Sequence, residues 1–363
     1  MRILHVVTRS EFGGAQGVVR TLAEAQSAQG HSVGIAAGLE GFWEAFAGMD
    51  RRVKSIPLPL LVRAIRPKED LMALVALGAL FRRWKPDIVH LHTSKAGALG
   101  RLAAGVDRRH IVYTMHGYDQ IRVLNRRMLF LDRLLARRCG AVVAVSRLDA
   151  DAMRRDGYTV ELIPNGVSQP VDSMSAQAAA IDRLRSKGLP IVIMAARDAR
   201  PKRIDLCRAL ASRFEGKAHF AWIGGEPMPT DPPAFHALGS IPQASSLLSR
   251  ADVFLLCSDN EGMPLSLLEA MAAGLPVVAS CTGGIPEVLS PEPDGGSAAG
   301  FVLPNDIDRM SSALNLLIES SARRRKMGAA GRNIWKTRYA SDIMAGEYNK
   351  LYERLLAGRD VFC

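Results

Sequence analysis

Short apolar runs alternate with longer amphipathic stretches from the first residues of the chain. The pattern predicts a helix over Val18–Gln29, after a glycine-containing loop at Glu11–Gly17. It predicts five strands in the first half, at Ile3–Thr8, Val33–Ala37, Ile88–His90, Ile111–Thr114 and Ala141–Val145. These runs are short and β-branched, as is typical of parallel strands buried on both faces. The alternation with helices predicts an α/β fold with a doubly wound parallel sheet.

A second series of the same kind follows a stretch of turn and polar residues at 161–175. Its predicted strands are Ile191–Ala195, His219–Ile223, Val253–Cys257 and Val277–Ser280. The last stretch, Met310–Leu356, has a helical pattern throughout. We therefore predict two Rossmann-like domains, residues 1–168 and 169–340, and a C-terminal helix in 341–363 that returns toward the first domain.

The bulk composition is that of an ordinary globular protein, with 48% hydrophobic and 23% charged residues. The five cysteines are scattered and form no Cys-x-x-Cys pair, which disfavours zinc and redox motifs and suits a reducing cytoplasm. The N-terminus lacks the pattern of a signal peptide. The longest strongly apolar stretch, Leu71–Phe81, is too short to span a bilayer.

The net charge of +11 is unevenly distributed. Residues 1–165 hold 25 Lys and Arg against 15 Asp and Glu, whereas residues 166–363 hold 22 against 21. This asymmetry suggests that the first half faces an anionic partner, such as a nucleic acid, an anionic membrane surface or a phosphorylated substrate. A generally basic protein is the alternative. No basic motif interleaved with aromatic residues is found, so nucleic acid is disfavoured.

Ligands of open parallel sheets bind beyond the carboxyl ends of the strands. The first such loop, Gly13–Gly17, resembles a dinucleotide loop without matching Gly-x-Gly-x-x-Gly, and no acidic residue closes the second strand. A nicotinamide-dependent dehydrogenase is therefore disfavoured. The glycines allow substrate oxygens to approach backbone N–H groups, or they serve only a tight turn.

The corresponding loop of the second half is strongly basic. Four cations lie within the seven residues Arg197–Arg203, directly after a predicted buried strand. Arg197 can hold phosphate oxygens bidentately and Lys202 can add a point charge, although charge runs are often merely solvated. Farther along, Glu261 lies in a loop and Glu269 in the helix that follows. Both carboxylates can face a ligand above the helix start, unless Glu269 is simply an exposed helix residue.

The segment Glu261–Glu269 resembles the Glu–seven residues–Glu motif of retaining family 4 glycosyltransferases of GT-B fold. The similarity runs from residue 1 to about residue 355. It includes Gly13–Ala15, Thr114–Gly117, Val145–Ser146, Pro164–Val167, Arg197 with Lys202, Trp222–Gly225, Ala270–Ala279 and Gly283–Glu287. One departure is Ala196, where the family has glycine, and another is Asp198, where it has an apolar residue.

The resemblance implies two Rossmann-like domains that face each other across a cleft, with the acceptor on the first and the donor nucleotide on the second. Arg197 and Lys202 would hold the donor diphosphate, Glu269 the ribose, and Glu261 the transferred sugar. The resemblance assigns further donor contacts to Gly14, Gly225, Ile241, Gly262, Met263 and Leu265, with Ile241 bordering the base. It places His116 at the donor sugar, as a catalytic residue with Glu261, Arg197 and Lys202, and His92 on the acceptor side.

The implied activity is retaining transfer of a hexosyl or N-acetylhexosaminyl group from a nucleotide-diphosphate sugar, with UDP as the expected nucleotide. The expected acceptor is a lipid-linked or envelope polysaccharide intermediate, and neither a cofactor nor a metal ion is expected. A sugar-nucleotide epimerase and a non-catalytic sugar-nucleotide-binding protein remain alternatives. Basic residues around the apolar run within Leu60–Trp84 suggest a peripheral position on the inner face of the cell membrane, whereas a core helix with a solvated basic end is the rival interpretation.

Overall fold

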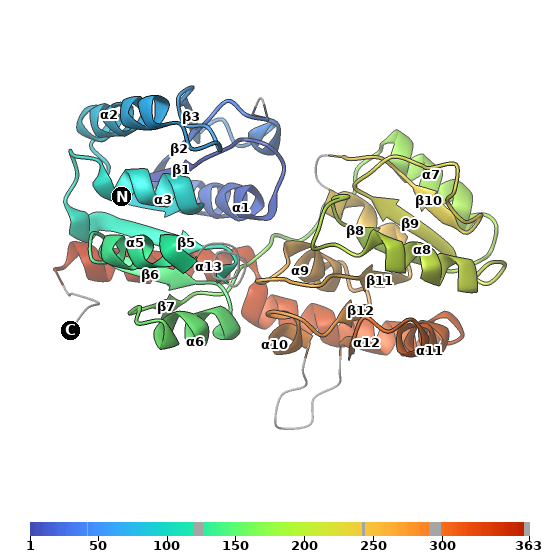
Figure 1. Ribbon diagram of the computed structural model, residues 1–363. Helices are drawn as coiled ribbons and strands as arrows, with labels where there is room; N and C mark the ends of the chain where they lie inside the picture. Colours follow the sequence, from blue (N-terminus) through green and yellow to red (C-terminus); the bar gives the residue numbers. More distant parts are fainter. Residues whose placement is uncertain (42, 119–125, 242–243, 290–298, 359–363) are drawn as a thin grey trace. The chain divides into compact units, whose positions relative to one another are not determined.

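The computed structural model describes residues 1–358 apart from residue 42 and residues 119–125, 242–243 and 290–298. The chain divides into two compact units. The first unit is Met1–Gly166 with Ser341–Cys363, and the second unit is Val167–Ala340. Each unit has its own parallel sheet with helices packed against it (Figure 1). The predicted α/β class with two Rossmann-like domains is confirmed.

The described residues of the first unit form a seven-stranded sheet in the order β3-β2-β1-β4-β5-β6-β7. Its strands are β1 (Arg2–Val7), β2 (Ser32–Ala37), β3 (Lys54–Pro57), β4 (Ile88–His92), β5 (Ile111–Met115), β6 (Ala141–Ala144) and β7 (Glu161–Leu162). All neighbouring strands are parallel, with His5 opposite His90 and His92 opposite Thr114. Because β1, β4 and β5 are adjacent, the residues at their carboxyl ends share one edge of the sheet.

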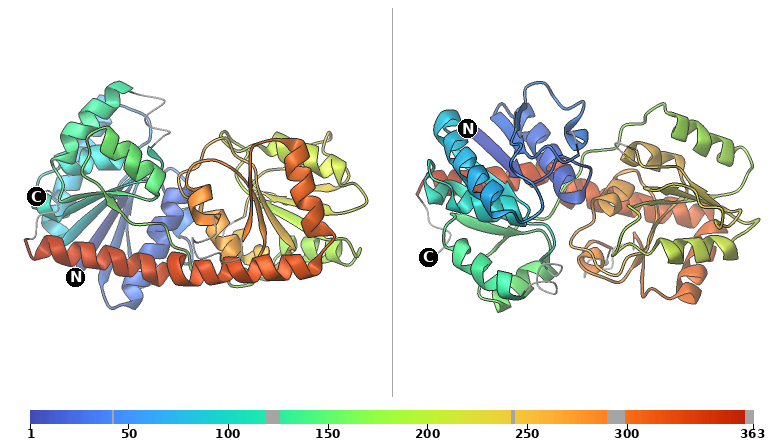
Figure 2. Two further views of the ribbon diagram at one scale, coloured as in Figure 1. Left: turned by 90° about the horizontal axis from the view of Figure 1, so that it is seen from below. Right: turned by 45° about the horizontal axis from the view of Figure 1, so that its top comes forward.

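The helices of this unit are α1 (Gly14–Ala28), α2 (Pro67–Trp84), α3 (Ser94–Leu102), α5 (Arg126–Ala136), α6 (Arg147–Arg155) and α13 (Ser341–Leu356), with short 3-10 turns η1 (Glu44–Phe46) and η2 (Arg108–His110). The C-terminal α13 packs beside α1 (Figure 2). A second group of helices in contact is formed by α2, α3 and α5, since α2 packs on α3 and α3 packs on α5. Apolar side chains of the strands fill the core between sheet and helices, including Leu4, Val89 and Tyr113.

The second unit has a six-stranded sheet in the order β10-β9-β8-β11-β12-β13 in the described residues. Its strands are β8 (Ile191–Ala195), β9 (His219–Ile223), β10 (Phe235–Ala237), β11 (Val253–Leu256), β12 (Val277–Ser280) and β13 (Gly300–Leu303). Its helices are α7 (Ala176–Arg185), α8 (Ile204–Arg213), η3 (Ala244–Arg250), α9 (Leu265–Ala272), α10 (Ile285–Leu289), α11 (Ile307–Ile318), α12 (Ser321–Ile334) and the π-helical η4 (Trp335–Tyr339). Since β8 and β11 are neighbours, the loops after them meet at one edge.

One sequence-based boundary is corrected by the structure. The first helix begins at Gly14 rather than Val18, because a helix start tolerates glycines whose N–H groups need no intrahelical partner. The predicted helical stretch Met310–Leu356 is divided among α11, α12, η4 and α13. It is interrupted at Ser320, whose side chain accepts a hydrogen bond from the backbone N–H of Arg323 and so caps α12, and again at Ala340, which is extended.

The short strands β3, β7, β10 and β13 were not predicted. All four are edge strands of their sheets, and few of their residues are fully buried. A short, half-exposed strand carries little of the apolar signal by which a central strand is recognised. None of the described helices combines the length and apolarity needed to cross a membrane.

Candidate active site

The loop after β8 carries the predicted phosphate-binding cations. Arg197 is exposed, two residues beyond the end of the strand. The backbone before it is fixed, because the Trp222 indole N–H donates to the carbonyl of Ala196 over 2.8 Å. A Cβ on Gly224 would lie 1.9 Å from the same carbonyl oxygen, and Gly224 has φ of +140°. The Ala196 position is thus held by close contact with the loop after β9.

The loop after β8 is joined to the loop after β11 by backbone hydrogen bonds. The N–H of Asp259 donates to Pro201 O over 2.9 Å, and the N–H of Arg203 donates to Cys257 O over 3.0 Å. Lys202, between them, forms a bridge with Ser258. This register brings the Lys202 ammonium against the Glu261 carboxylate in a largely buried ion pair. The structure therefore brings together two of the predicted site residues that lie 59 positions apart.

The Glu261–Gly262 segment is held from its other side by the loop after β12. Gly283 has φ of +55°, and a Cβ there would lie 1.5 Å from the Glu261 carbonyl oxygen. The neighbouring Gly284 N–H donates to Gly262 O over 2.7 Å. Only glycine fits at position 283, so the backbone that carries Glu261 is placed by a contact that admits no side chain.

The helix α9 begins directly after this segment. Pro264 is extended and precedes the first helical residue, Leu265, while Met263 is buried beneath the helix start. The first N–H groups of a helix have no intrahelical acceptor and point toward the space that an anion can occupy. Gly274, with φ of +80°, ends the helix as its sequence predicts.

Glu269 lies one turn into α9 and is partly buried. Burial raises the pKa of its carboxyl to about 7. In the described part of the chain, no hydrogen bond or ion pair reaches this carboxylate. Because the side chain is partly buried, Glu269 is not the fully exposed helix residue of the alternative interpretation.

The remaining predicted donor contacts have different structural settings. A Cβ on Gly225 would lie 2.1 Å from the Trp222 ring, so the protein itself requires glycine there. Around Gly14 a Cβ would meet nothing within 4 Å, and the fold gives no steric reason for glycine. Ile241 is half-buried and borders residues 242–243, which lie outside the described residues.

Two predicted histidines lie in the first unit, at the carboxyl edge of its sheet. His92 ends β4 and His116 follows β5, and His92 Nδ1 lies 3.0 Å from His116 Nε2. Burial lowers the pKa of His116 to about 4 and that of His92 well below 6.5, so both rings are neutral at neutral pH. Gly14 belongs to the same unit, whereas the other predicted site residues belong to the second.

Sequence reasoning missed the polar groups that lie beneath these histidines. His5 is hydrogen-bonded to His92 and to Gln26, and His90 is hydrogen-bonded to Thr114 and Tyr352. The available signal was polar residues at alternate positions of otherwise apolar strands, which places them on one buried face.

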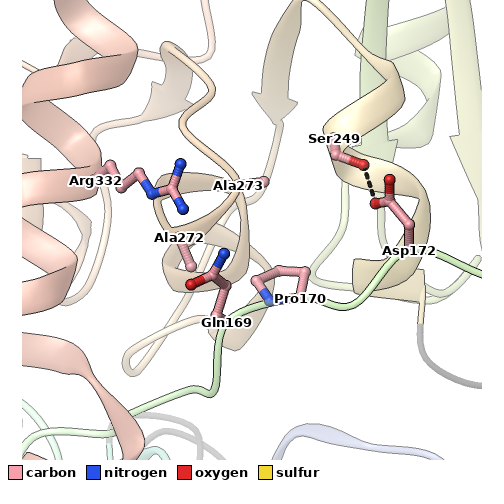
Figure 3. A pocket seen from close by; sticks show the side chains of 7 residues that line it. All are labelled: Gln169, Pro170, Asp172, Ser249, Ala272, Ala273 and Arg332. Carbon is pink, nitrogen blue, oxygen red and sulfur yellow. Dashed lines mark hydrogen bonds between the residues drawn. The ribbon is translucent and has the colours of Figure 1, made fainter.

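A surface pocket of the second unit lies at the opposite end of α9 from this site (Figure 3). It is lined by Gln169, Pro170, Asp172, Ser249, Ala272, Ala273 and Arg332. Figure 3 shows the Ser249 hydroxyl donating to Asp172. None of the predicted site residues lines this pocket, and its position away from the carboxyl ends of the strands separates it from the candidate site.

Comparisons with known proteins find two family models that match the chain. The family model of Glycosyltransferase Family 4 matches residues 12–169, and that of Glycosyl transferases group 1 matches residues 232–334. The chain is 28% identical over 302 residues to an Escherichia coli UDP-Gal:alpha-D-GlcNAc-diphosphoundecaprenol alpha-1,3-galactosyltransferase, which covers 73% of this chain and 75% of that protein.

Two further similarities are to a second bacterial enzyme and to a solved structure. The chain is 31% identical over 175 residues to a Campylobacter jejuni N,N'-diacetylbacillosaminyl-diphospho-undecaprenol alpha-1,3-N-acetylgalactosaminyltransferase, covering 46% of this chain and 45% of that protein. Among solved structures, sucrose-phosphate synthase from Thermosynechococcus elongatus superposes with a TM-score of 0.82 at 21% identity, over 99% of this chain and 100% of that one. This last similarity shows the fold.

Proposed function

Because the chain belongs to glycosyltransferase family 4 and has the GT-B fold, we propose that it transfers a hexosyl or N-acetylhexosaminyl group from a UDP-linked sugar to a lipid-linked acceptor, with retention of the anomeric configuration. The first unit would bind the acceptor and the second unit the donor nucleotide. The observation that carries the proposal is the joined loops after β8 and β11, which bring Lys202 and Glu261 together beside Arg197 and the start of α9.

The chemistry of this edge suits a sugar nucleotide. Breaking the bond between sugar and phosphate leaves a diphosphate anion and a sugar with oxocarbenium character. Preplaced cations stabilise the leaving group as its charge develops, and we assign that role to Arg197 and Lys202. Glu261 and the N–H groups around Gly262, Met263 and Leu265 would hold the transferred sugar, and Glu269 the ribose. Gly225 and Ile241 would border the nucleotide, and Gly14 would leave room for the donor.

In the proposed mechanism the protein supplies no metal ion. The arginine and lysine would neutralise the diphosphate, so transfer should continue at an unchanged rate after treatment with EDTA. In the described part of the chain, the histidines His5, His90 and His92 are the group of ligand-type residues close enough to hold an ion, and they lie beneath the sheet edge in the first unit.

The acceptor proposal draws on the two relatives whose names specify undecaprenol diphosphate-linked acceptors. The direct experiment is incubation of the full chain with UDP-galactose, UDP-glucose or UDP-N-acetylglucosamine and a polyprenyl diphosphate sugar. A glycolipid longer by one sugar is the expected product. Conversion of the UDP sugar into its epimer without acceptor would instead support an epimerase, and binding without turnover would support a non-catalytic protein.

A lipid-linked acceptor requires access to a membrane, and the first unit has a surface suited to it. The helices α2 and α5 both pack on α3. We use the name α2–α5 surface for the exposed apolar residues that lie on or beside these two helices, which are between 47 and 78% exposed: Ile65, Leu71, Met72, Val75, Phe130, Leu131 and Leu134. The opposite side of α2 packs Ala73, Leu77 and Phe81 into the core. The rival interpretation, a core helix with a solvated basic end, accounts for these buried residues but not for the exposed Leu71, Met72 and Val75.

Basic side chains accompany these apolar residues. Exposed cations on or beside the two helices are Arg63, Arg66, Lys68, Arg82, Arg83, Arg133 and Arg137. Each Lys or Arg near an anionic bilayer contributes about 1 kcal/mol of attraction. We propose that the α2–α5 surface rests on the anionic inner face of the cell membrane, where the acceptor would be held.

Sedimentation with vesicles tests this docking. The full chain should bind vesicles that contain phosphatidylglycerol, bind less at high salt, and bind weakly to neutral vesicles. Replacing Leu71 and Val75 by serine should weaken binding, whereas Leu316→Ser, at an exposed leucine of the second unit, should not. Equal sedimentation with neutral and anionic vesicles would contradict the electrostatic docking and would leave the transferase assignment intact.

A further inference from the structure

A row of buried polar side chains crosses the first unit beneath its site edge. His116 Nε2 lies 3.0 Å from His92 Nδ1, His92 Nε2 lies 3.1 Å from His5 Nδ1, and His5 Nε2 lies 2.9 Å from Gln26 Oε1. His5, His92 and Gln26 are fully buried, on β1, β4 and α1. Three imidazole rings in direct contact are unusual in a core, and their hydrogen bonds restrict one another.

A metal ion is not a good explanation for this cluster. His5, His90 and His92 offer ring nitrogens within 4.8 Å of one another. Each of these rings, however, has a polar partner on both nitrogens, since His90 contacts Thr114 and Tyr352 while His5 and His92 contact the residues of the row. Binding an ion would break these hydrogen bonds within a buried core.

In this row, the tautomer of each imidazole ring determines the tautomer of its neighbour. A neutral imidazole has one donor nitrogen and one acceptor nitrogen. Burial lowers the pKa of His5 and His116 to about 4, and that of His92 well below 6.5, so each ring carries a single proton at neutral pH. If one ring donates to the next, every following ring must donate in the same direction.

The direction follows from the amide end. Gln26 Oε1 can only accept, so His5 carries its proton on Nε2 and accepts on Nδ1. His92 then donates from Nε2, and His116 donates from Nε2 to His92 Nδ1. The Gln26 amide is itself oriented by Asn349 of α13, whose Oδ1 lies 3.5 Å from Gln26 Nε2 and whose Nδ2 donates to Gln29 Oε1 over 2.6 Å.

The row ends at an acceptor without a partner. His116 Nδ1 is buried, and no hydrogen bond reaches it from the described part of the chain. We propose that Gln26, His5 and His92 are positioning residues that fix the proton of His116 on Nε2, so that Nδ1 presents a lone pair to a hydroxyl group of the transferred sugar. The site would thereby favour a sugar that offers a hydroxyl donor at this point over one that offers a carboxylate. The choice of ligand rests on the proposed function, whereas the tautomer does not.

The tautomer is measured directly on the full chain labelled with 15N-histidine, without ligand. Long-range 1H–15N spectra at pH 7 should show His116 with a protonated Nε2 and an unprotonated Nδ1, the signals being assigned with His116→Asn. A protonated Nδ1, or averaged shifts for the two nitrogens, would overturn the proposal. This result is independent of any enzymatic activity.

Variants test whether the row is the cause. Gln26→Met keeps a similar length and removes the acceptor, so His116 should change to averaged nitrogen shifts. The control is His31→Gln, which alters a histidine of the same unit whose Nδ1 contacts the N-terminal amine of Met1 and not the row, and it should retain the wild-type tautomer. Retention of a single Nε2–H tautomer in a folded Gln26→Met protein would refute the role of Gln26. If that variant fails to fold, His5→Leu removes the acceptor one step nearer to His116 and supplies the same comparison.

Titration separates this inference from the proposed function. UDP-glucose, UDP-galactose and UDP-N-acetylglucosamine are added in turn, with UDP alone as the control. A sugar conjugate that binds should move the His116 Nδ1 signal, and UDP should not. Saturation by a conjugate with no change at Nδ1 would overturn the hydroxyl contact although the donor binds. Failure of all three to bind would refute both the UDP-hexose donor and the hydroxyl contact, while the tautomer of the free protein would still decide the role of the row.

Discussion

The partly buried carboxyl of Glu269 makes the stability of the protein depend on pH. Burial raises its pKa from 4.5 to about 7, and no partner in the described residues compensates for its charge. A folded-state pKa above the unfolded value means that the contribution of this group is fully present below about pH 4.5 and is lost as the pH rises to about 7. A difference of about 2.5 pKa units corresponds to about 3 kcal/mol, which is a large fraction of a typical free energy of unfolding.

The substitution Glu269→Gln tests this expectation, because glutamine has a similar shape and no charge at any pH. Urea unfolding of both proteins at pH 4.5, 6, 7 and 8 gives the free energies of unfolding. The free energy of unfolding of the variant should increase relative to that of the wild type as the pH rises, by about 3 kcal/mol between pH 4.5 and 8. Parallel pH curves for the two proteins would refute the assignment of a raised pKa to Glu269.

Donor binding should depend on the same ionisation. A carboxylate that accepts hydrogen bonds from two ribose hydroxyls must be deprotonated, so only the ionised fraction of the protein is competent. With a pKa of about 7 in the free protein, that fraction rises about tenfold between pH 6 and pH 8. Calorimetry should therefore show about tenfold tighter binding of UDP-glucose at pH 8 in the wild type, and weak binding without this pH dependence in Glu269→Gln. Wild-type affinity that stays constant across this range would exclude Glu269 as the ribose acceptor.

Three further results are expected. Arg197→Ala and Lys202→Ala should each lower kcat/KM about 10- to 100-fold, as expected for loss of a charge-assisted contact worth about 1.5–3 kcal/mol, and wild-type turnover by a folded Arg197→Ala protein would remove that residue from the diphosphate site. Gly283→Ala should lower the free energy of unfolding by about 1–3 kcal/mol or more, because its Cβ would lie 1.5 Å from the Glu261 carbonyl oxygen. An unchanged urea midpoint would contradict the close packing of the two loops. The first-formed product should keep the anomeric configuration of the donor, and an inverted coupling pattern in its proton NMR spectrum would disprove retention.

The central strands were predictable because both of their faces are buried. The ranges predicted for β8, β9 and β12 agree with the structure, and each is apolar apart from His219 at the start of β9 and Ser280 at the end of β12. The edge strand β3 was not predictable in the same way, since three of its four residues are exposed. Its place in the sheet depends on pairing with β2, which is a tertiary interaction that local periodicity does not contain.

The candidate site was only partly predictable for a related reason. The sequence identifies Lys202 and Glu261 as ligand-type residues after two strands, but their ion pair requires β8 and β11 to be neighbours. The sequence does not give the order of strands. Prediction of the row from Gln26 to His116 would require further tertiary information, because β1, β4 and β5 must be adjacent and α1 must cover the same face. The sequence shows the single polar residues within apolar strands, but it does not show that these residues contact one another.

The ion pair between Lys202 and Glu261 also affects the energetics of donor binding. A buried cation without an anionic partner is costly, and the pair avoids this cost in the free protein. In the proposed complex the donor diphosphate would replace Glu261 as the anion beside Lys202, so the lysine would exchange one anionic partner for another. Glu261 would then be released to accept hydrogen bonds from the sugar hydroxyls. The sugar would therefore be held firmly only when the diphosphate is in place, which would favour the intact donor over a free sugar through the charges of these two residues.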